Sequence, residues 1–193
     1  MPATSAPKTK LPFHTIPDAE AMPGLRVIKL TPHVDARGRF IETFRQEWFP
    51  GKPAMLQGNR SDSEANVLRG LHFHLKQADY WYVPSGRVLV ALADLREGSP
   101  TKGAVATFEI GDGHDLGVYI PPGVAHGYYA ITKATMTYLV DRTYDNQDEF
   151  GVAWDCPDMA IRWPFQGTPN LSGRDQKNPK CRDLEQLPPF RGA

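Results

Sequence analysis

The sequence is poor in cysteine and has no excess charge of either sign. Its 193 residues include only two cysteines, Cys156 and Cys181. Two are too few for a disulfide framework, and we therefore expect a reduced, cytoplasmic protein. Lysine and arginine together number 22, as do aspartate and glutamate, so the formal net charge is zero. This balance argues against a general nucleic-acid binder and against a polybasic membrane anchor.

Long apolar runs are also missing. No run approaches the ~18 residues that a membrane span needs. Residues 1–24 are rich in proline and alanine and lack the apolar centre of a secretory signal. We expect roughly the first ten residues to form a loose tail, because they carry too few apolar groups to offset the entropy of ordering.

Helical periodicity is absent before residue 170, where short apolar or alternating runs stand between turn residues instead. The expected strands are 26–30, 39–44, 67–74, 79–83, 87–96, 104–110, 116–120, 127–131, 134–140 and 150–154. Such closely spaced short strands predict an all-β sandwich or barrel rather than βαβ units. After residue 164 the chain becomes polar and proline-rich, with room for at most a short helix.

The chemically informative residues gather in two segments. His72 and His74 are two residues apart, which places both imidazoles on one face of a strand. His126 follows a Pro–Gly turn further along the chain. Each histidine alone is an ordinary strand or surface residue. Together with Arg69 and Tyr138, they predict a shared pocket.

These two segments resemble the signatures of the cupin jelly rolls, which are double-stranded β-helices. The first signature is carried by His72, His74, Asp79 and Gly86, and the second by Pro121, Gly123 and His126. Two neighbouring imidazoles, a carboxylate and a third imidazole suit a divalent metal ion. The resemblance implies a jelly roll with a short C-terminal extension that could be helical.

Over most of its length the chain is similar to the dTDP-4-dehydrorhamnose 3,5-epimerase family. The similarity is carried, in order along the chain, by DARGRFIETF, QGNRSDSEANVLRGLHFH, YIPPGVAHGYYAI, the strand of Tyr138, FGVAWDCPDMAIRWP and LSGRD. It implies a tail and lead-in segment over 1–24, an epimerase-like cupin domain over 25–180 and a C-terminal tail over 181–193. It also implies an isomerase that inverts C3, C5 or both in a nucleotide-linked 4-keto-6-deoxy sugar.

The resemblance assigns three catalytic roles. His72 matches the base that removes the proton next to the ketone, and Asp175 matches the carboxylate that orients this base. Tyr138 matches the acid that protonates the opposite face. From the sequence alone, Asp175 would be a helix cap and Tyr138 an ordinary strand aromatic.

The resemblance also assigns substrate contacts. The residues that match substrate-binding positions, or lie beside them, are Arg37, Glu42, Gln57, Asn59, Arg69, Lys76 and His126. The arginine fork suits pyrophosphate oxygens. In this family the N-terminal segment of one subunit crosses to its neighbour, which implies a homodimer. No membrane or nucleic-acid partner is expected.

Three positions depart from the family pattern. His74 stands where glutamine is usual, and Asp79 stands where a lysine near the enolate oxygen is usual. Cys156 replaces an aspartate, and we interpret it as a small, inert buried thiol. Lys76, in a shortened loop, is a candidate substitute for the missing lysine.

These departures leave alternatives open. The favoured hypothesis is an enzyme without a cofactor. One alternative is a metal-dependent cupin that uses His72, His74, Asp79 and His126, although His72 could not then serve freely as the base. The other is a non-catalytic jelly roll that binds a nucleotide sugar, which would not need His72, Tyr138 and Asp175 together.

Overall fold

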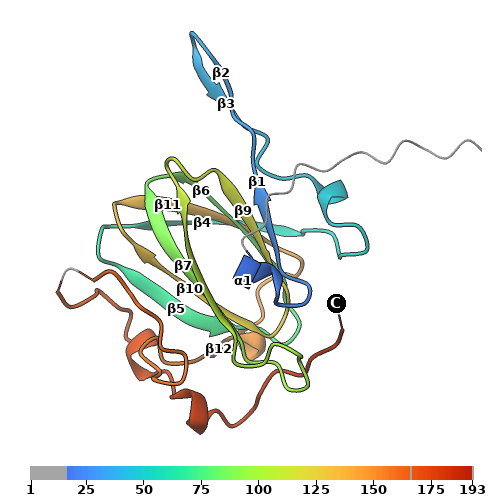
Figure 1. The fold of residues 1–193 in the computed structure, drawn as a ribbon, viewed down its shortest axis with the longest axis vertical. Helices are drawn as coiled ribbons and strands as arrows, with labels where there is room; N and C mark the ends of the chain where they lie inside the picture. The colour runs from blue at the N-terminus through green and yellow to red at the C-terminus, as the bar shows by residue number, and fades with distance from the viewer. Residues whose placement is uncertain (1–16, 166, 193) are drawn as a thin grey trace, which may run out of the picture.

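Two antiparallel five-stranded sheets face each other in the computed structural model, which describes residues 17–165 and 167–192 (Figure 1). The first sheet has the order β1 (Arg26–Lys29), β9 (Leu116–Ile120), β6 (Asp79–Ser85), β11 (Ala134–Val140) and β4 (Gln57–Ser63). The second has the order β12 (Phe150–Gly151), β5 (Leu68–Phe73), β10 (Val124–Ala130), β7 (Arg87–Asp94) and β8 (Val105–Gly111). This architecture confirms the prediction of an all-β jelly roll. The expected tail over the first ten residues lies outside the described part of the chain.

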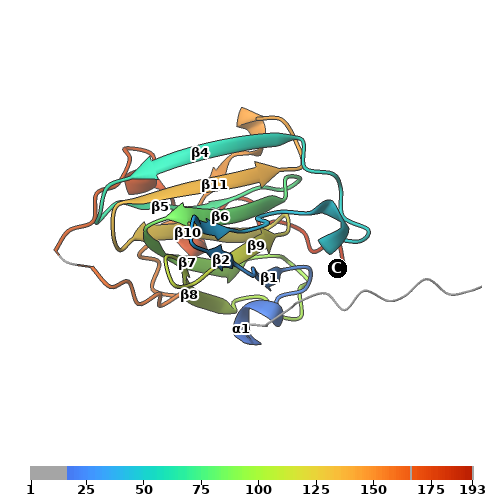
Figure 2. The same ribbon diagram turned by 90° about the horizontal axis from the view of Figure 1, so that it is seen from above.

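The remaining elements are short. A hairpin of β2 (His33–Asp35) and β3 (Gly38–Phe40) projects from the sandwich (Figure 1), and in the view from above it overlies the sheets (Figure 2). The helical elements are α1 (Pro17–Glu20) and the 3₁₀ turns η1 (Gln46–Trp48), η2 (Asn146–Asp148), η3 (Asp175–Lys177) and η4 (Cys181–Asp183). Within the described residues, none of the helices has the length and apolar character needed to traverse a bilayer.

The main core lies between the sheets because alternate residues of each strand point inward. Val88, Val90 and Leu92 of β7 are fully buried there and pack in one cluster with Met136 of β11. The inward positions of β4, and Asp79 at the start of β6, carry polar side chains instead. The apolar core therefore gives way to a polar cavity at this side of the sandwich.

A second core lies where the C-terminal segment packs on the second sheet. Leu71 and Phe73 of β5 cluster there with Val152, and Cys156 belongs to the same cluster. Cys156 is disulfide-bonded to Cys181, with the Cα atoms 6.2 Å apart. The expectation of a reduced, free thiol at Cys156 is therefore wrong: the returning segment brings together two cysteines that are 25 residues apart.

An irregularity in β5 places both Arg69 and His72 on the cavity. Residues three apart on a regular strand point to opposite faces. The pairing of β5 with β10 shifts between these two residues, which realigns their side chains in the manner of a β-bulge. Gly70 lies at the shift, with a φ of +119°, and a Cβ there would sit 2.7 Å from the Cα of Gly127. Glycine is therefore required at this position.

We expect Gly70→Ala to lower the free energy of unfolding by at least about 2 kcal/mol, through backbone strain and the clash with β10. Denaturant titration measures this change. Gly173→Ala is the matched control, because its Cβ would meet nothing within 4 Å, and it should shift stability by less than about 0.5 kcal/mol. Wild-type stability of Gly70→Ala would contradict this account of β5.

Candidate active site

A cavity of about 430 Å³ opens between the two sheets. This size is within the range of small-molecule sites. Its lining is formed by Gln57, Asn59, Ser61, Arg69, His72, His74, Gln77, Asp79, Trp81, His126, Tyr128, Met136, Tyr138, Val140, Tyr144, Glu149 and Arg174. The cavity thus brings together most of the residues that the sequence predicts, from strands far apart in the chain.

His72 is held by a buried carboxylate. Its Nε2 lies 2.6 Å from Oδ1 of Asp175, whose side chain is 4% exposed. Burial raises the pKa of Asp175, but hydrogen bonds from His72 and from the Gly70 N–H outweigh it and leave the pKa below its usual value. An ionised Asp175 can only accept a hydrogen bond, so Nε2 of His72 donates, and in the neutral ring Nδ1 carries the lone pair. Nδ1 is then the ring nitrogen that can take a proton.

Tyr138 enters the cavity from the other sheet. It lies on β11, paired with Trp81 of β6 and Asn59 of β4, whereas His72 lies on β5. Burial raises the pKa of the Tyr138 phenol, and the nearby charge of Asp79 raises it further. The phenol therefore stays protonated near neutral pH, as a proton donor must.

Polar groups suited to a nucleotide line the same cavity. The Arg69 guanidinium is positioned by Ser63, whose Oγ accepts from Nε at 3.0 Å. Gln57 donates to Asn59 Oδ1 at 2.9 Å on the neighbouring wall. Arg174 forms an ion pair of 2.9 Å with Glu149. These groups offer cations and amides to an anionic, hydrogen-bonding ligand.

Three expected substrate contacts lie away from the cavity lining. Arg37 is at the tip of the projecting hairpin, 90% exposed and bonded to Asp35. Glu42 follows the hairpin and forms an ion pair with Arg45. Lys76 has its Nζ 4.0 Å from an Asp145 carboxylate oxygen. Within the chain, the structure does not bring these residues to His72.

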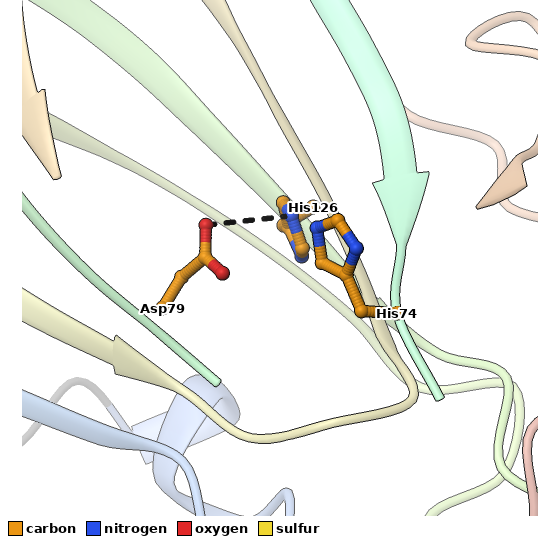
Figure 3. A group of neighbouring side chains, drawn as sticks. All are labelled: His74, Asp79 and His126. Carbon is orange, nitrogen blue, oxygen red and sulfur yellow. Dashed lines mark ion pairs between the residues drawn. The ribbon is translucent and has the colours of Figure 1, made fainter. Parts of the chain in front are cut away.

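Two imidazoles and a carboxylate, all able to bind a metal ion, lie buried together on the cavity wall. His74, Asp79 and His126 each offer a donor atom within 4.8 Å of those of the other two, and all three are at most 5% exposed (Figure 3). His72, the fourth residue of the predicted metal set, is not part of this group. Burial lowers the pKa of His126, although the charge of Asp79 opposes this, so its ring is neutral near pH 7.

Several lining residues escaped the sequence analysis. Trp81 and Tyr128 read as ordinary strand aromatics, but their edge-to-face contact, with ring centroids 5.9 Å apart, forms part of the cavity wall. Tyr144 and Glu149 fall in a segment interpreted only as a turn. Arg174 directly precedes Asp175 in the sequence, and this position was the one sequence feature that could have indicated a place in the cavity.

The arrangement can move a proton across a bound molecule. An imidazole oriented by a buried carboxylate lies on one sheet, and a protonated phenol lies on the other. Such a pair suits abstraction of a carbon-bound proton from one face and its return to the opposite face.

The chain is similar to known sugar-nucleotide epimerases. Residues 19–183 match the dTDP-4-dehydrorhamnose 3,5-epimerase family. A Streptomyces niveus dTDP-4-dehydrorhamnose 3-epimerase is 38% identical over 177 residues, covering 85% of each chain. A Neisseria gonorrhoeae dTDP-4-dehydrorhamnose 3,5-epimerase is 35% identical over 161 residues, 80% of this chain, but the match spans only 49% of that longer protein.

A solved structure agrees with the fold. The Legionella pneumophila dTDP-6-deoxy-D-glucose-3,5-epimerase, in complex with dTDP-4-keto-L-rhamnose, superposes with a TM-score of 0.82 at 30% identity. The superposition covers 87% of this chain and 94% of that one. Taken with the family match over most of the chain, this places the protein in the dTDP-4-dehydrorhamnose 3,5-epimerase family of isomerases.

Proposed function

We propose that this protein epimerises a dTDP-linked 4-keto-6-deoxy sugar of the dTDP-4-keto-6-deoxyglucose class, at C3, C5 or both, in deoxysugar biosynthesis. The observation that carries the proposal is the placement of the Asp175-bonded His72 and the protonated Tyr138 on opposite sheets around one cavity.

In the proposed reaction, His72 Nδ1 takes the proton from the carbon next to the C4 ketone. The C–H electron pair forms a C=C bond, and the carbonyl electrons move to the oxygen to give an enolate. Tyr138 then donates its proton to that carbon from the opposite face, which inverts the configuration. No electrons are exchanged with another molecule, so the proton transfers need no redox cofactor.

The nucleotide is proposed to bind along the polar part of the cavity. Arg69 and Arg174 are the cations there, and Gln57 and Asn59 offer amide groups on the wall formed by β4. Arginine forks match the geometry of pyrophosphate oxygens. We place the enzyme in the cytoplasm, because a charged nucleotide sugar does not cross a bilayer unaided.

We further propose a homodimer in which the β2–β3 hairpin reaches the partner's cavity. The hairpin projects from the sandwich and exposes Val34 (75%) and Phe40 (70%), which is typical of a surface covered by another chain (Figure 1). Arg37 at its tip and Glu42 after it would then contact the substrate bound in the partner's site.

His72→Gln should lower proton exchange by about 10²–10⁴-fold, because the general base is removed while the cavity keeps its shape. The measurement is ¹H NMR of dTDP-4-keto-6-deoxyglucose in D₂O, which follows loss of the C3 and C5 proton signals. His114→Gln is the control, since His114 is exposed and lies outside the cavity. Exchange at the wild-type rate in His72→Gln would contradict the proposed base, and no exchange with wild-type protein would contradict the proposed function.

Mixed dimers test whether Arg37 acts across subunits. Arg37→Ala and His72→Gln homodimers should each be strongly impaired. In a heterodimer of the two, one site keeps His72 and receives an intact hairpin. Random pairing should therefore restore about a quarter of wild-type activity after co-expression. Wild-type activity of Arg37→Ala, or no recovery in the mixture, would contradict the trans contact.

A further inference from the structure

We infer that His74, Asp79 and His126 form a binding site for one divalent first-row transition-metal ion, held beside the proposed base without using it. Figure 3 shows the three side chains converging, with Asp79 on the first sheet and the two imidazoles on the side of the second. Two imidazole nitrogens and one carboxylate are a donor set that such ions prefer.

Both imidazoles are fixed in the tautomer that a metal needs. Nδ1 of His126 lies 2.9 Å from the carbonyl oxygen of Val124, and Nδ1 of His74 lies 2.7 Å from that of Asp148. A carbonyl only accepts, so each Nδ1 carries a hydrogen, and in the neutral rings each Nε2 carries the lone pair. Backbone carbonyls that hold the outer nitrogen in this way are the usual support of metal-ligating histidines.

The carbonyl behind His74 is itself held in place. The buried carboxylate of Asp148 accepts backbone N–H groups of Leu75, Lys76 and Gln77, at 2.7, 3.1 and 3.2 Å. Residue 148 is thereby tied to the loop that leaves β5. The orientation of the His74 ring is thus preorganised.

The Asp79 carboxylate is also held by hydrogen bonds, and one of its oxygens faces His126. Its Oδ1 accepts from Gln77 Nε2 at 2.9 Å, and its Oδ2 accepts from Trp81 Nε1 at 3.1 Å. The same Oδ2 lies 4.0 Å from Nε2 of His126, which carries no hydrogen in this tautomer. Two electron-rich atoms therefore face each other across 4.0 Å, and a cation placed between them would be attracted to both.

The donor atoms must move closer together before they can bind one ion. Metal bonds of about 2.0–2.2 Å to nitrogen and oxygen require donors about 3.0–3.4 Å apart in octahedral or tetrahedral geometry. The donor atoms of the three residues lie within 4.8 Å of one another, with those of His126 and Asp79 4.0 Å apart, so these separations must shorten by up to about 1.8 Å, which side-chain rotation can supply.

The site lies next to the proposed base yet leaves it free. His126 is the cross-strand partner of His72, and His74 follows two residues after His72. Because Asp175 engages His72 and the three-residue group excludes it, metal binding and base catalysis do not compete for one imidazole. When bound, the ion would supply a Lewis acid that polarises a carbonyl oxygen, a role that rests on the proposed function, whereas the binding itself does not.

Cobalt titration of tag-free, chelator-stripped full-length protein tests the inference through the visible absorption of bound Co²⁺. Wild-type protein should bind one Co²⁺ per chain. Binding should weaken at least about 100-fold in His74→Gln and in Asp79→Asn, since each loses a direct ligand. His72→Gln and His114→Gln are the matched controls and should bind as wild type does. Circular dichroism confirms that each variant is folded.

Absence of Co²⁺ binding by wild-type protein at millimolar concentration would overturn the inference, as would unchanged binding in both His74→Gln and Asp79→Asn. The D₂O exchange assay separates this result from the proposed function. Exchange activity without Co²⁺ binding would overturn the metal site alone. Site-specific Co²⁺ binding without exchange would support the site and count against the epimerase proposal.

Discussion

The hydrogen bond between His72 and Asp175 is the constraint on which the rest of the site depends. It joins a strand of the second sheet to a residue 103 positions later, in the C-terminal segment. A carboxylate that is 4% exposed is costly unless it is bonded, and His72 and the Gly70 N–H provide those bonds. The C-terminal segment must therefore fold back along β5 before the His72 ring, the proposed base, is oriented.

Further contacts hold the C-terminal segment against β5. The Leu68 N–H donates to the carbonyl of Asn170 at 3.0 Å, and the Val152 N–H donates to that of Leu71 at 2.9 Å. On the apolar side of β5, Leu71 and Phe73 pack against the same returning chain. Alternate side chains of β5 thus pack in the apolar core on one face of the strand and line the cavity on the other. The register shift at Gly70 adds Arg69 to the face that lines the cavity.

The sequence predicts the sandwich well because most strands carry alternating apolar residues. It fails at β4, whose polar residues Gln57–Ser63 lack the usual strand signal. The strand signal is missing because the inward side chains of β4 line the polar cavity rather than the apolar core. The strand expected over 39–44 was also too long, since β3 ends at Phe40.

The prediction of the site depended on different kinds of signal. The shared face of His72 and His74 follows from strand geometry alone. The partnership of Asp175 with His72 does not, because only the fold brings residues so distant in sequence together. Spacing also grouped His72 with the metal-type residues, whereas the structure separates it from His74, Asp79 and His126. The Cys156–Cys181 pair was missed because it, too, is brought together only by the fold.

The central claim is that two groups on opposite sheets act on opposite faces of one carbon. The most direct test is the stereochemistry of deuterium incorporation by Tyr138→Phe with dTDP-4-keto-6-deoxyglucose in D₂O. The account predicts that His72 still exchanges the proton, while net inversion falls by about 10²-fold or more because the opposite-face acid is gone. Inversion at the wild-type rate by Tyr138→Phe would contradict it.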